Sequence, residues 1–102
     1  MSDYIRDMLN KTILDVEDVH DYVQIRLSEN SGLNIYNKFS MIDSDRASLP
    51  GRRIASVRSG DDCISIFLSP KGTIRVSIKD ADFRGPEAME YVAANGARVI
   101  WP

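Results

Sequence analysis

Apolar and polar residues alternate along two long stretches of the chain, which is the pattern of β-strands with one buried face. Val23, Ile25 and Leu27 share one parity, and the residues between them are polar. The same alternation returns 41 residues later, over residues 62–69. With the flanking alternating segments, the pattern predicts six strands, at residues 12–18, 21–28, 33–39, 53–58, 62–69 and 73–79.

The two stretches belong to longer segments that align without a gap, residues 13–38 with residues 54–79. Seven of the 26 aligned pairs are identical, where average residue usage gives about one or two. These pairs are Ile13/Ile54, Val16/Val57, Asp21/Asp62, Ile25/Ile66, Leu27/Leu68, Ser28/Ser69 and Lys38/Lys79. A slip of one residue would turn every apolar side chain outward, so the alignment preserves a buried face. We therefore predict a pseudo-repeat of two three-stranded antiparallel meanders within one domain, residues 1–102.

The predicted meanders have turns rich in Gly, Asn and Asp, at residues 30–32, 60–62 and 70–72. These residue types suit tight hairpins, which need positive φ or side chains that bond their own backbone. A three-stranded meander of this size cannot bury its apolar face alone. The fold class is therefore expected to be mainly β (α+β), with the meanders forming a small sandwich or a half-open barrel.

The C-terminal region has the residues of a helix start and a helix stop. Pro86 and Glu87 suit a helix N-terminus, and Asn95-Gly96 suits a C-terminal stop. Apolar residues four apart lie between them. This pattern predicts one C-terminal helix at about residues 86–94, followed by a last strand at 97–101.

Two further segments complete the predicted organisation. Residues 3–10 are expected to form a short helix, capped by Ser2 and with an apolar stripe that includes Tyr4 and Met8. The polar stretch 40–52 is expected to be the loop that joins the two meanders.

Tyr36 and Phe67 have the parity opposite to that of the core positions. The favoured interpretation is that the predicted C-terminal helix covers them in a second small cluster. The alternative is that they lie in an interface with a partner, where aromatic residues are enriched.

Composition limits the classes of protein that remain. The chain has a net charge of −2, which argues against a nucleic-acid binder that uses its whole surface. No apolar run approaches the length of a membrane span, and the N-terminus does not resemble a secretory signal. Cys63 is the single cysteine, so no intrachain disulfide is possible and the cytoplasm is the expected compartment.

The residues that carry most enzyme chemistry are few. Cys63 borders an alternating apolar run and is expected in the core, and His20, the single histidine, is expected in an exposed turn. Two such residues exclude the usual zinc sites, and no nucleotide-binding fingerprint is present, so no catalytic residue, metal or cofactor is predicted. A substrate- or ligand-binding module that uses a cavity with Cys63 and His20 is the alternative from another class.

Charged residues in the predicted loops are the candidates for partner contacts. The residues expected to bind a partner are Asp43, Asp45, Asp61 and Asp62. Acids in turns are also ordinary turn-forming residues. A group of arginines in or after the long loop would either contact phosphates of RNA or block a strand edge: Arg46, Arg52, Arg53 and Arg58.

Two stretches carry a resemblance to a known group of proteins. They are GLNIYN at residues 32–37 and SIKDADFRGPEAM at residues 77–89. With them, the chain from about residue 12 onward resembles small bacterial immunity proteins of polymorphic and contact-dependent growth inhibition toxin systems. The resemblance implies a cytoplasmic, non-enzymatic protein that binds one cognate toxin domain and blocks its active site, and it carries over no catalytic residue.

Overall fold

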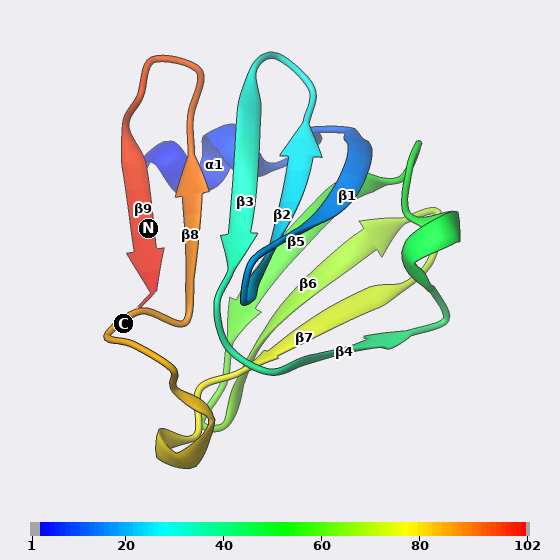
Figure 1. Ribbon diagram of the computed structural model, residues 1–102. Helices are drawn as coiled ribbons and strands as arrows, with labels where there is room; N and C mark the ends of the chain where they lie inside the picture. Colours follow the sequence, from blue (N-terminus) through cyan, green and yellow to red (C-terminus); the bar gives the residue numbers. More distant parts are fainter. Residues whose placement is uncertain (1–2, 102) are drawn as a thin grey trace.

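The computed structural model describes residues 3–101, which form two antiparallel β-sheets and a short helix (Figure 1). The five-stranded sheet contains, in spatial order, β1 (Ile13–Val19), β2 (Tyr22–Leu27), β3 (Ser31–Ile35), β8 (Met89–Val92) and β9 (Arg98–Trp101). The four-stranded sheet contains β4 (Phe39–Ile42), β7 (Thr73–Ser77), β6 (Cys63–Ser69) and β5 (Arg53–Ser59). The mainly β fold of two antiparallel sheets is confirmed.

Strands β1, β2 and β3 pair with one another in the same register as strands β5, β6 and β7. Ile13 lies opposite Leu27, and 41 residues later Ile54 lies opposite Leu68. A register shift follows directly after this pair in both sheets, and in both the regular ladder resumes at the same aligned position. The pairs of β2 with β3 and of β6 with β7 follow the same offset. The two meanders therefore share strand order, register and irregularity, while their common origin stays a prediction.

The two sheets touch where β1 and β5 begin. Thr12 forms an isolated antiparallel bridge with Arg53. The Ile13 amide donates to the carbonyl of Arg52 at 2.8 Å, and the Ile54 amide donates to that of Lys11 at 3.0 Å. In the alignment of the two meanders, Ile13 corresponds to Ile54 and Lys11 corresponds to Arg52. The two bonds are therefore equivalent, as they would be across an approximate two-fold axis. The two sheets are therefore joined at this corner of the sandwich.

The two halves of the chain exchange their fourth strands. After β3 the chain crosses to the other sheet, where β4 pairs with β7; after β7 it crosses back, and β8 pairs with β3 (Figure 1). Tyr36 donates its amide to the carbonyl of Ala88 at 3.0 Å, and Ser77 donates to that of Lys38 at 2.9 Å. The buried Asn37 also donates its Nδ2 to the carbonyl of Ser77 at 2.7 Å. The four-stranded sheet is thus completed by β4 from the first half, and the five-stranded sheet by β8 and β9 from the second.

The predicted helix at residues 86–94 is wrong, because this segment contains strand β8. Met89, Tyr91 and Ala93 enter the core at alternate positions, a period that suits a strand, while Glu90 between them has the outward parity. The pairs Met89/Ala93 and Ala88/Val92 are also four residues apart, which suits a helix, but pairing with β3 overrode the local helix signals. Asn95-Gly96 forms the hairpin turn before β9, which confirms the predicted last strand.

The loop expected at residues 40–52 contains two short elements. Strand β4 occupies its start, and a 3₁₀ helix spans Arg46–Ser48. The third predicted strand, 33–39, is correspondingly divided between β3 and β4. Strand β4 has only four residues, so its alternation was too short to detect in the sequence.

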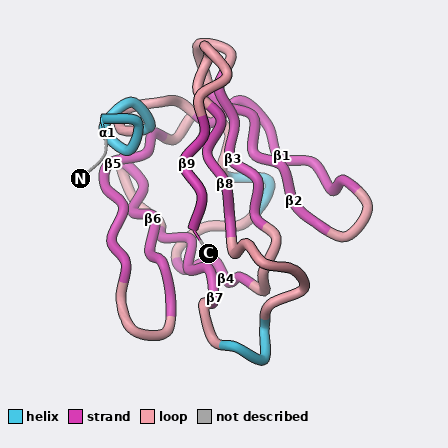
Figure 2. The backbone as a smooth tube through the Cα atoms, turned by 90° about the vertical axis from the view of Figure 1, so that its left-hand side faces the viewer, coloured by secondary structure: helices cyan, strands magenta, loops and turns pink. Residues whose placement is uncertain are grey.

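The inward faces of both sheets form one core. Its members are the apolar side chains of both meanders together with those that α1 (Asp3–Met8), β8 and the loops add: Met8, Ile13, Val23, Ile25, Leu27, Leu33, Ile35, Leu49, Ile54, Ile64, Ile66, Leu68, Ile74, Val76, Ala88, Met89, Tyr91 and Ala93. Figure 2 shows α1 at one end of the molecule, near the start of β5, and the loop between β7 and β8 at the opposite end. The predicted N-terminal helix is therefore confirmed, while its Ser2 cap lies outside the described residues.

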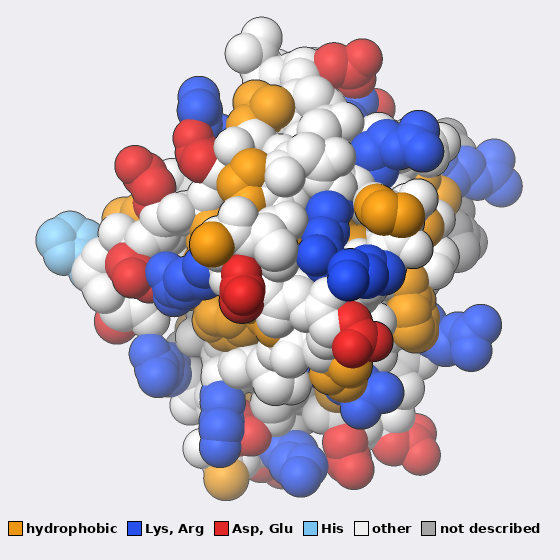
Figure 3. Space-filling model, turned by 90° about the vertical axis from the view of Figure 1, so that its right-hand side faces the viewer, with side chains coloured by type: hydrophobic (Ala, Val, Ile, Leu, Met, Phe, Trp, Pro, Cys, Tyr) orange, Lys and Arg blue, Asp and Glu red, His pale blue; other side chains and the backbone are white. Residues whose placement is uncertain are grey.

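Charged side chains cover the outside of the sandwich. Arg26 pairs with Asp15 at 2.5 Å and Arg98 pairs with Glu90 at 3.3 Å on the outer face of the five-stranded sheet. Figure 3 shows the side of the molecule on which β4 and the 3₁₀ helix Arg46–Ser48 lie, with Lys and Arg side chains spread over it and interspersed with Asp and Glu.

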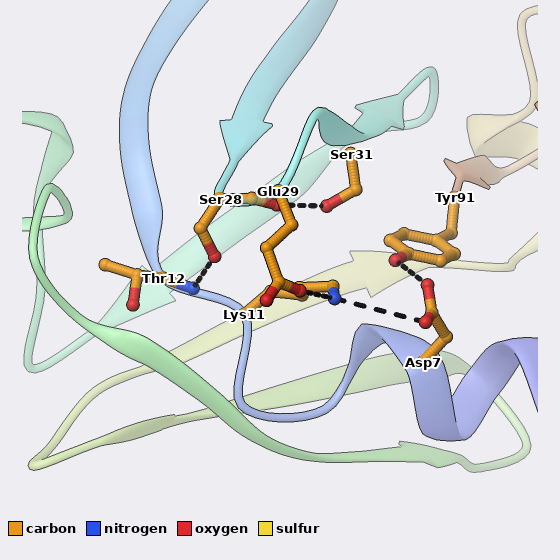
Figure 4. Close-up of polar contacts among 7 residues, drawn as sticks. All are labelled: Asp7, Lys11, Thr12, Ser28, Glu29, Ser31 and Tyr91. Carbon is orange, nitrogen blue, oxygen red and sulfur yellow. Dashed lines mark hydrogen bonds and ion pairs between the residues drawn. The ribbon is translucent and has the colours of Figure 1, made fainter. Parts of the chain in front are cut away.

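A network of polar contacts fastens α1 to the five-stranded sheet (Figure 4). The buried Tyr91 of β8 donates its hydroxyl to Asp7 of α1 at 2.6 Å. Lys11 lies between Asp7, at 3.9 Å, and Glu29 of the β2–β3 turn, with which it forms a hydrogen-bonded ion pair. The bond to Glu29 raises the pKa of Lys11, and burial together with the Asp7 bond raises the pKa of Tyr91 to about 12.

Candidate binding surfaces

The four aspartates expected to bind a partner lie in two separate places. Asp43 and Asp45 follow β4, whose last residue lies opposite the first residue of β7. Asp61 and Asp62 lie in the turn before β6, whose first residue is opposite the last residue of β7. All four are exposed. The structure therefore brings together each pair but puts the two pairs at opposite ends of the four-stranded sheet.

One of these aspartates has a clear role in the local structure. Asp45 caps the 3₁₀ helix, because its side chain accepts from the Ser48 amide at 2.9 Å while the Ser48 hydroxyl accepts from the Asp45 amide. The reciprocal bonds form a capping box. The sequence did not distinguish this role from a partner contact.

The arginines predicted as a phosphate-binding group are divided by the fold. Arg46 pairs with Asp18 at 2.8 Å. Arg52 donates to the carbonyls of Asp43 and Lys71, at 3.0 and 3.1 Å. These two guanidinium groups hold the chain together, and only Arg53 and Arg58 of the predicted group project from β5 without such a bond among the described residues.

The structure separates His20 and Cys63, the pair required for the alternative of a catalytic or ligand-binding cavity. His20 lies exposed in the β1–β2 turn, as predicted, with a φ of 56°. Cys63 is half-buried rather than in the core, because it has the outward parity of β6 between the inward Ile64 and the β5–β6 turn. The two residues line different surface hollows. Residues 3–101 also contain no group of three His, Cys, Asp or Glu side chains that could hold a metal ion.

A groove at one end of the five-stranded sheet gathers residues that are distant in sequence. Tyr22 of β2 and Tyr36, which follows β3, form a tilted pair with ring centroids 5.2 Å apart. A hollow of about 380 Å³ lies between these rings and the loop of residues 84–87. Arg84 of that loop donates to the carbonyl of Asp21 at 2.9 Å. We call this hollow the tyrosine groove; the residues that line it are Asp21, Tyr22, Tyr36, Arg84, Gly85, Pro86 and Glu87.

A buried carboxylate supports the groove from the side of the sheet. Glu90 of β8 is only 4% exposed although it has the outward parity. Its Oε1 accepts from the hydroxyl of Tyr36 and from Nδ2 of Asn34, both at 3.3 Å, and Arg98 binds its Oε2. Burial, reinforced by the charge of Glu90, raises the pKa of Tyr36. The Tyr36 ring is thus held in place as a neutral phenol at the edge of the groove.

The favoured interpretation of Tyr36 and Phe67 is wrong, because the helix expected to cover them does not exist. Both side chains are half-buried on outer faces of the sandwich. The sequence indicated their outward direction correctly. It did not indicate the tyrosine groove, because the loop of residues 84–87 was expected to begin a helix.

Comparison with known proteins adds no relative: no protein-family model matches the chain, and searches of curated proteins and of solved structures find no match.

Within residues 3–101, no helix is both long enough and apolar enough to cross a membrane.

Proposed function

We propose that this chain is an immunity protein, which acts in the bacterial cytoplasm by binding one cognate toxin domain and blocking its active site. The resemblance to such proteins is carried by residues 32–37 and 77–89. The first stretch contributes Tyr36 to the tyrosine groove, and the second contributes residues 84–87. This convergence of both stretches on one surface hollow is the observation that carries the proposal.

The groove has the features of an anchor site for a protein partner. Tyrosine is enriched at the centres of interfaces, because it buries a large area while its hydroxyl still forms hydrogen bonds. Tyr22 and Tyr36 pack on each other, and Glu90 fixes the hydroxyl of Tyr36. A partner side chain that enters the hollow would therefore meet rings that are already in place, which lowers the entropy lost on binding.

The surface around the groove favours a basic partner. Asp21 and Glu87 line the groove together with Arg84, and β1 next to it carries Glu17, which forms no ion pair within residues 3–101, whereas Asp15 and Asp18 are paired with arginines. With a net charge of −2, only such a local patch can steer association. A stable interface needs about 800 Å² on each partner, which is about one seventh of the 5902 Å² of accessible surface. The proposed interface occupies one end of the five-stranded sheet and the adjoining loops.

The proposal is tested by co-expressing the protein with the toxin encoded beside it and measuring growth and complex formation. The intact protein is expected to restore growth. Tyr22→Ala and Tyr36→Ala are each expected to weaken binding at least tenfold, as loss of an interface anchor does. Phe67→Ala is the matched control, because it removes an outward aromatic ring from the opposite sheet. Failure of the intact protein to bind the toxin or to restore growth would reject the function.

The predicted aspartates provide a second arm of the same experiment. Asp43→Asn combined with Asp45→Asn, and Asp61→Asn combined with Asp62→Asn, alter the two ends of the four-stranded sheet. If these changes abolish binding and the tyrosine variants do not, the toxin docks on the four-stranded sheet and not at the tyrosine groove.

A further inference from the structure

Strand pairing lines up a row of side chains across the outer face of the four-stranded sheet. Ser40 of β4 lies opposite Arg75 of β7, Arg75 lies opposite Ser65 of β6, and Ser65 lies opposite Arg58 of β5. Neighbouring strands are about 4.8 Å apart, so the backbones at Arg75 and Arg58 are about 10 Å apart. Two guanidinium groups therefore project from one face on either side of a small serine.

An aromatic ring lies beside this row. Phe67 is two residues along β6 from Ser65 and shares its outward parity. It lies opposite Thr73 on one side and Ser56 on the other, which makes it the diagonal neighbour of both arginines. Phe67 is only half-buried and has small hydroxyl residues on both sides, so part of its ring is accessible to a ligand.

This face carries positive charge that the fold does not neutralise. Strands β4, β5, β6 and β7 contain no Asp or Glu, whereas β1 alone contains three. Arg53, Arg58 and Arg75 form no ion pair or side-chain hydrogen bond among residues 3–101, unlike Arg26 and Arg98 on the other sheet. A hollow of about 330 Å³ at the end of the face is lined by Lys38 and Lys79 and also by Asp62 and Asp82, so the unneutralised charge is concentrated on the strands themselves.

We propose that this face binds single-stranded nucleic acid, with Arg58 and Arg75 contacting phosphates and Phe67 stacking on a base. Polynucleotides combine phosphates with flat rings, and sheet faces that bind them pair cationic side chains with an aromatic platform. An acidic protein would use the arginines but not the stacking ring. A duplex has no free base face for Phe67. The proposal does not depend on the toxin or on the tyrosine groove.

The experiment measures fluorescence anisotropy of labelled oligouridine and oligothymidine strands of about 12 nucleotides, titrated with the intact protein at low salt. Phe67→Ala is expected to weaken binding about tenfold, and Phe67→Leu, which keeps an apolar side chain without a ring, should behave likewise. Arg58→Gln and Arg75→Gln should each weaken binding and reduce the slope of log K against log salt by about 0.7. The two oligonucleotides decide between RNA and DNA.

Two controls make the proposal falsifiable. Arg26→Gln removes an outward arginine from the other sheet and Ile100→Ala removes an exposed apolar side chain there, and both variants should bind as the intact protein does. Circular dichroism verifies that every variant is folded. The proposal is overturned if no binding occurs at low salt, if polyglutamate or the matching duplex competes as well as the single strand, or if Arg26→Gln weakens binding as much as Arg58→Gln. Since Tyr22→Ala and Phe67→Ala act on different sheets, failure of this proposal is distinguishable from failure of the toxin proposal.

Discussion

Gly72 is restricted both by its backbone conformation and by a neighbouring side chain. Its φ is +104°, in the region that disfavours other residues, and an added Cβ would lie 2.5 Å from Nη1 of Arg52. Arg52 cannot move aside freely, because the same nitrogen donates to the carbonyls of Asp43 and Lys71. The arginine thus ties together the loop after β4 and the β6–β7 turn.

Gly72→Ala is expected to lower the free energy of unfolding by more than the 1–2 kcal/mol that a left-handed conformation costs an ordinary residue. The matched control is Gly51→Ala, because Gly51 has a similar φ of +93° but no atom within 4 Å of the added Cβ. Urea denaturation of both variants separates backbone strain from the clash with Arg52. Equal losses in the two variants would contradict the clash.

The raised pKa of Tyr91 leads to a prediction of how the free energy of unfolding depends on pH. An unfolded tyrosine loses its proton near pH 10, whereas the pKa of Tyr91 in the folded chain is about 12. The neutral hydroxyl therefore stabilises the fold fully below pH 10, and this contribution decreases as the pH rises from 10 to 12, by about 1.4 kcal/mol per unit.

Tyr91→Phe, which cannot titrate, provides the comparison. At pH 8 the variant should be less stable than the intact protein by about 1.5–3 kcal/mol, because the bond to the Asp7 carboxylate is lost. The difference between the two proteins should shrink between pH 10 and pH 11 in urea denaturation. A difference that stays constant over this range would show that the hydroxyl titrates normally.

At the scale of elements, Asp45 caps the 3₁₀ helix Arg46–Ser48, a structural role that the sequence did not distinguish from a contact with a partner. Asp45→Ala removes the capping box and is expected to destabilise the fold by about 1 kcal/mol. Asp61→Ala is the control, since Asp61 is also an exposed loop aspartate, has no positive φ, and its side chain forms no hydrogen bond or ion pair within residues 3–101. Thermal denaturation of both variants checks the prediction, and equal stabilities would contradict a capping role for Asp45.

Elements with a long, unambiguous alternation could be predicted from the sequence, and the others could not. The six meander strands alternate over enough residues to fix both type and buried face. The apolar residues of β8 fit a helix as well as a strand, and only the vacant edge of β3 decides between them. The candidate surfaces were harder to predict from the sequence. Arg58 and Arg75 come onto one row only through the pairing of β5, β6 and β7. The tyrosine groove depends on the loop of residues 84–87, whose position follows from the placement of β8.

At the scale of the whole molecule, the exchanged fourth strands predict how the halves behave when separated. Fragments 1–50 and 51–102 should each lack a cooperative thermal transition, because each needs β4 or β8 from the other. When mixed, they should recover the circular dichroism of the intact protein. The control is fragment 51–88, which lacks β8 and β9 and should not complement. A cooperative transition in either fragment alone would contradict the exchange.

The strand exchange also affects how new binding properties could arise in this protein. The tyrosine groove takes its rings from the first half of the chain and its loop from the second. The row of side chains across the four-stranded sheet takes Ser40 from the first half, and Arg58, Ser65 and Arg75 from the second. Neither half could therefore be replaced as a cassette without altering both surfaces. Selection on one surface would act on substitutions in both halves, so an apparently duplicated sequence is inherited as a single functional unit.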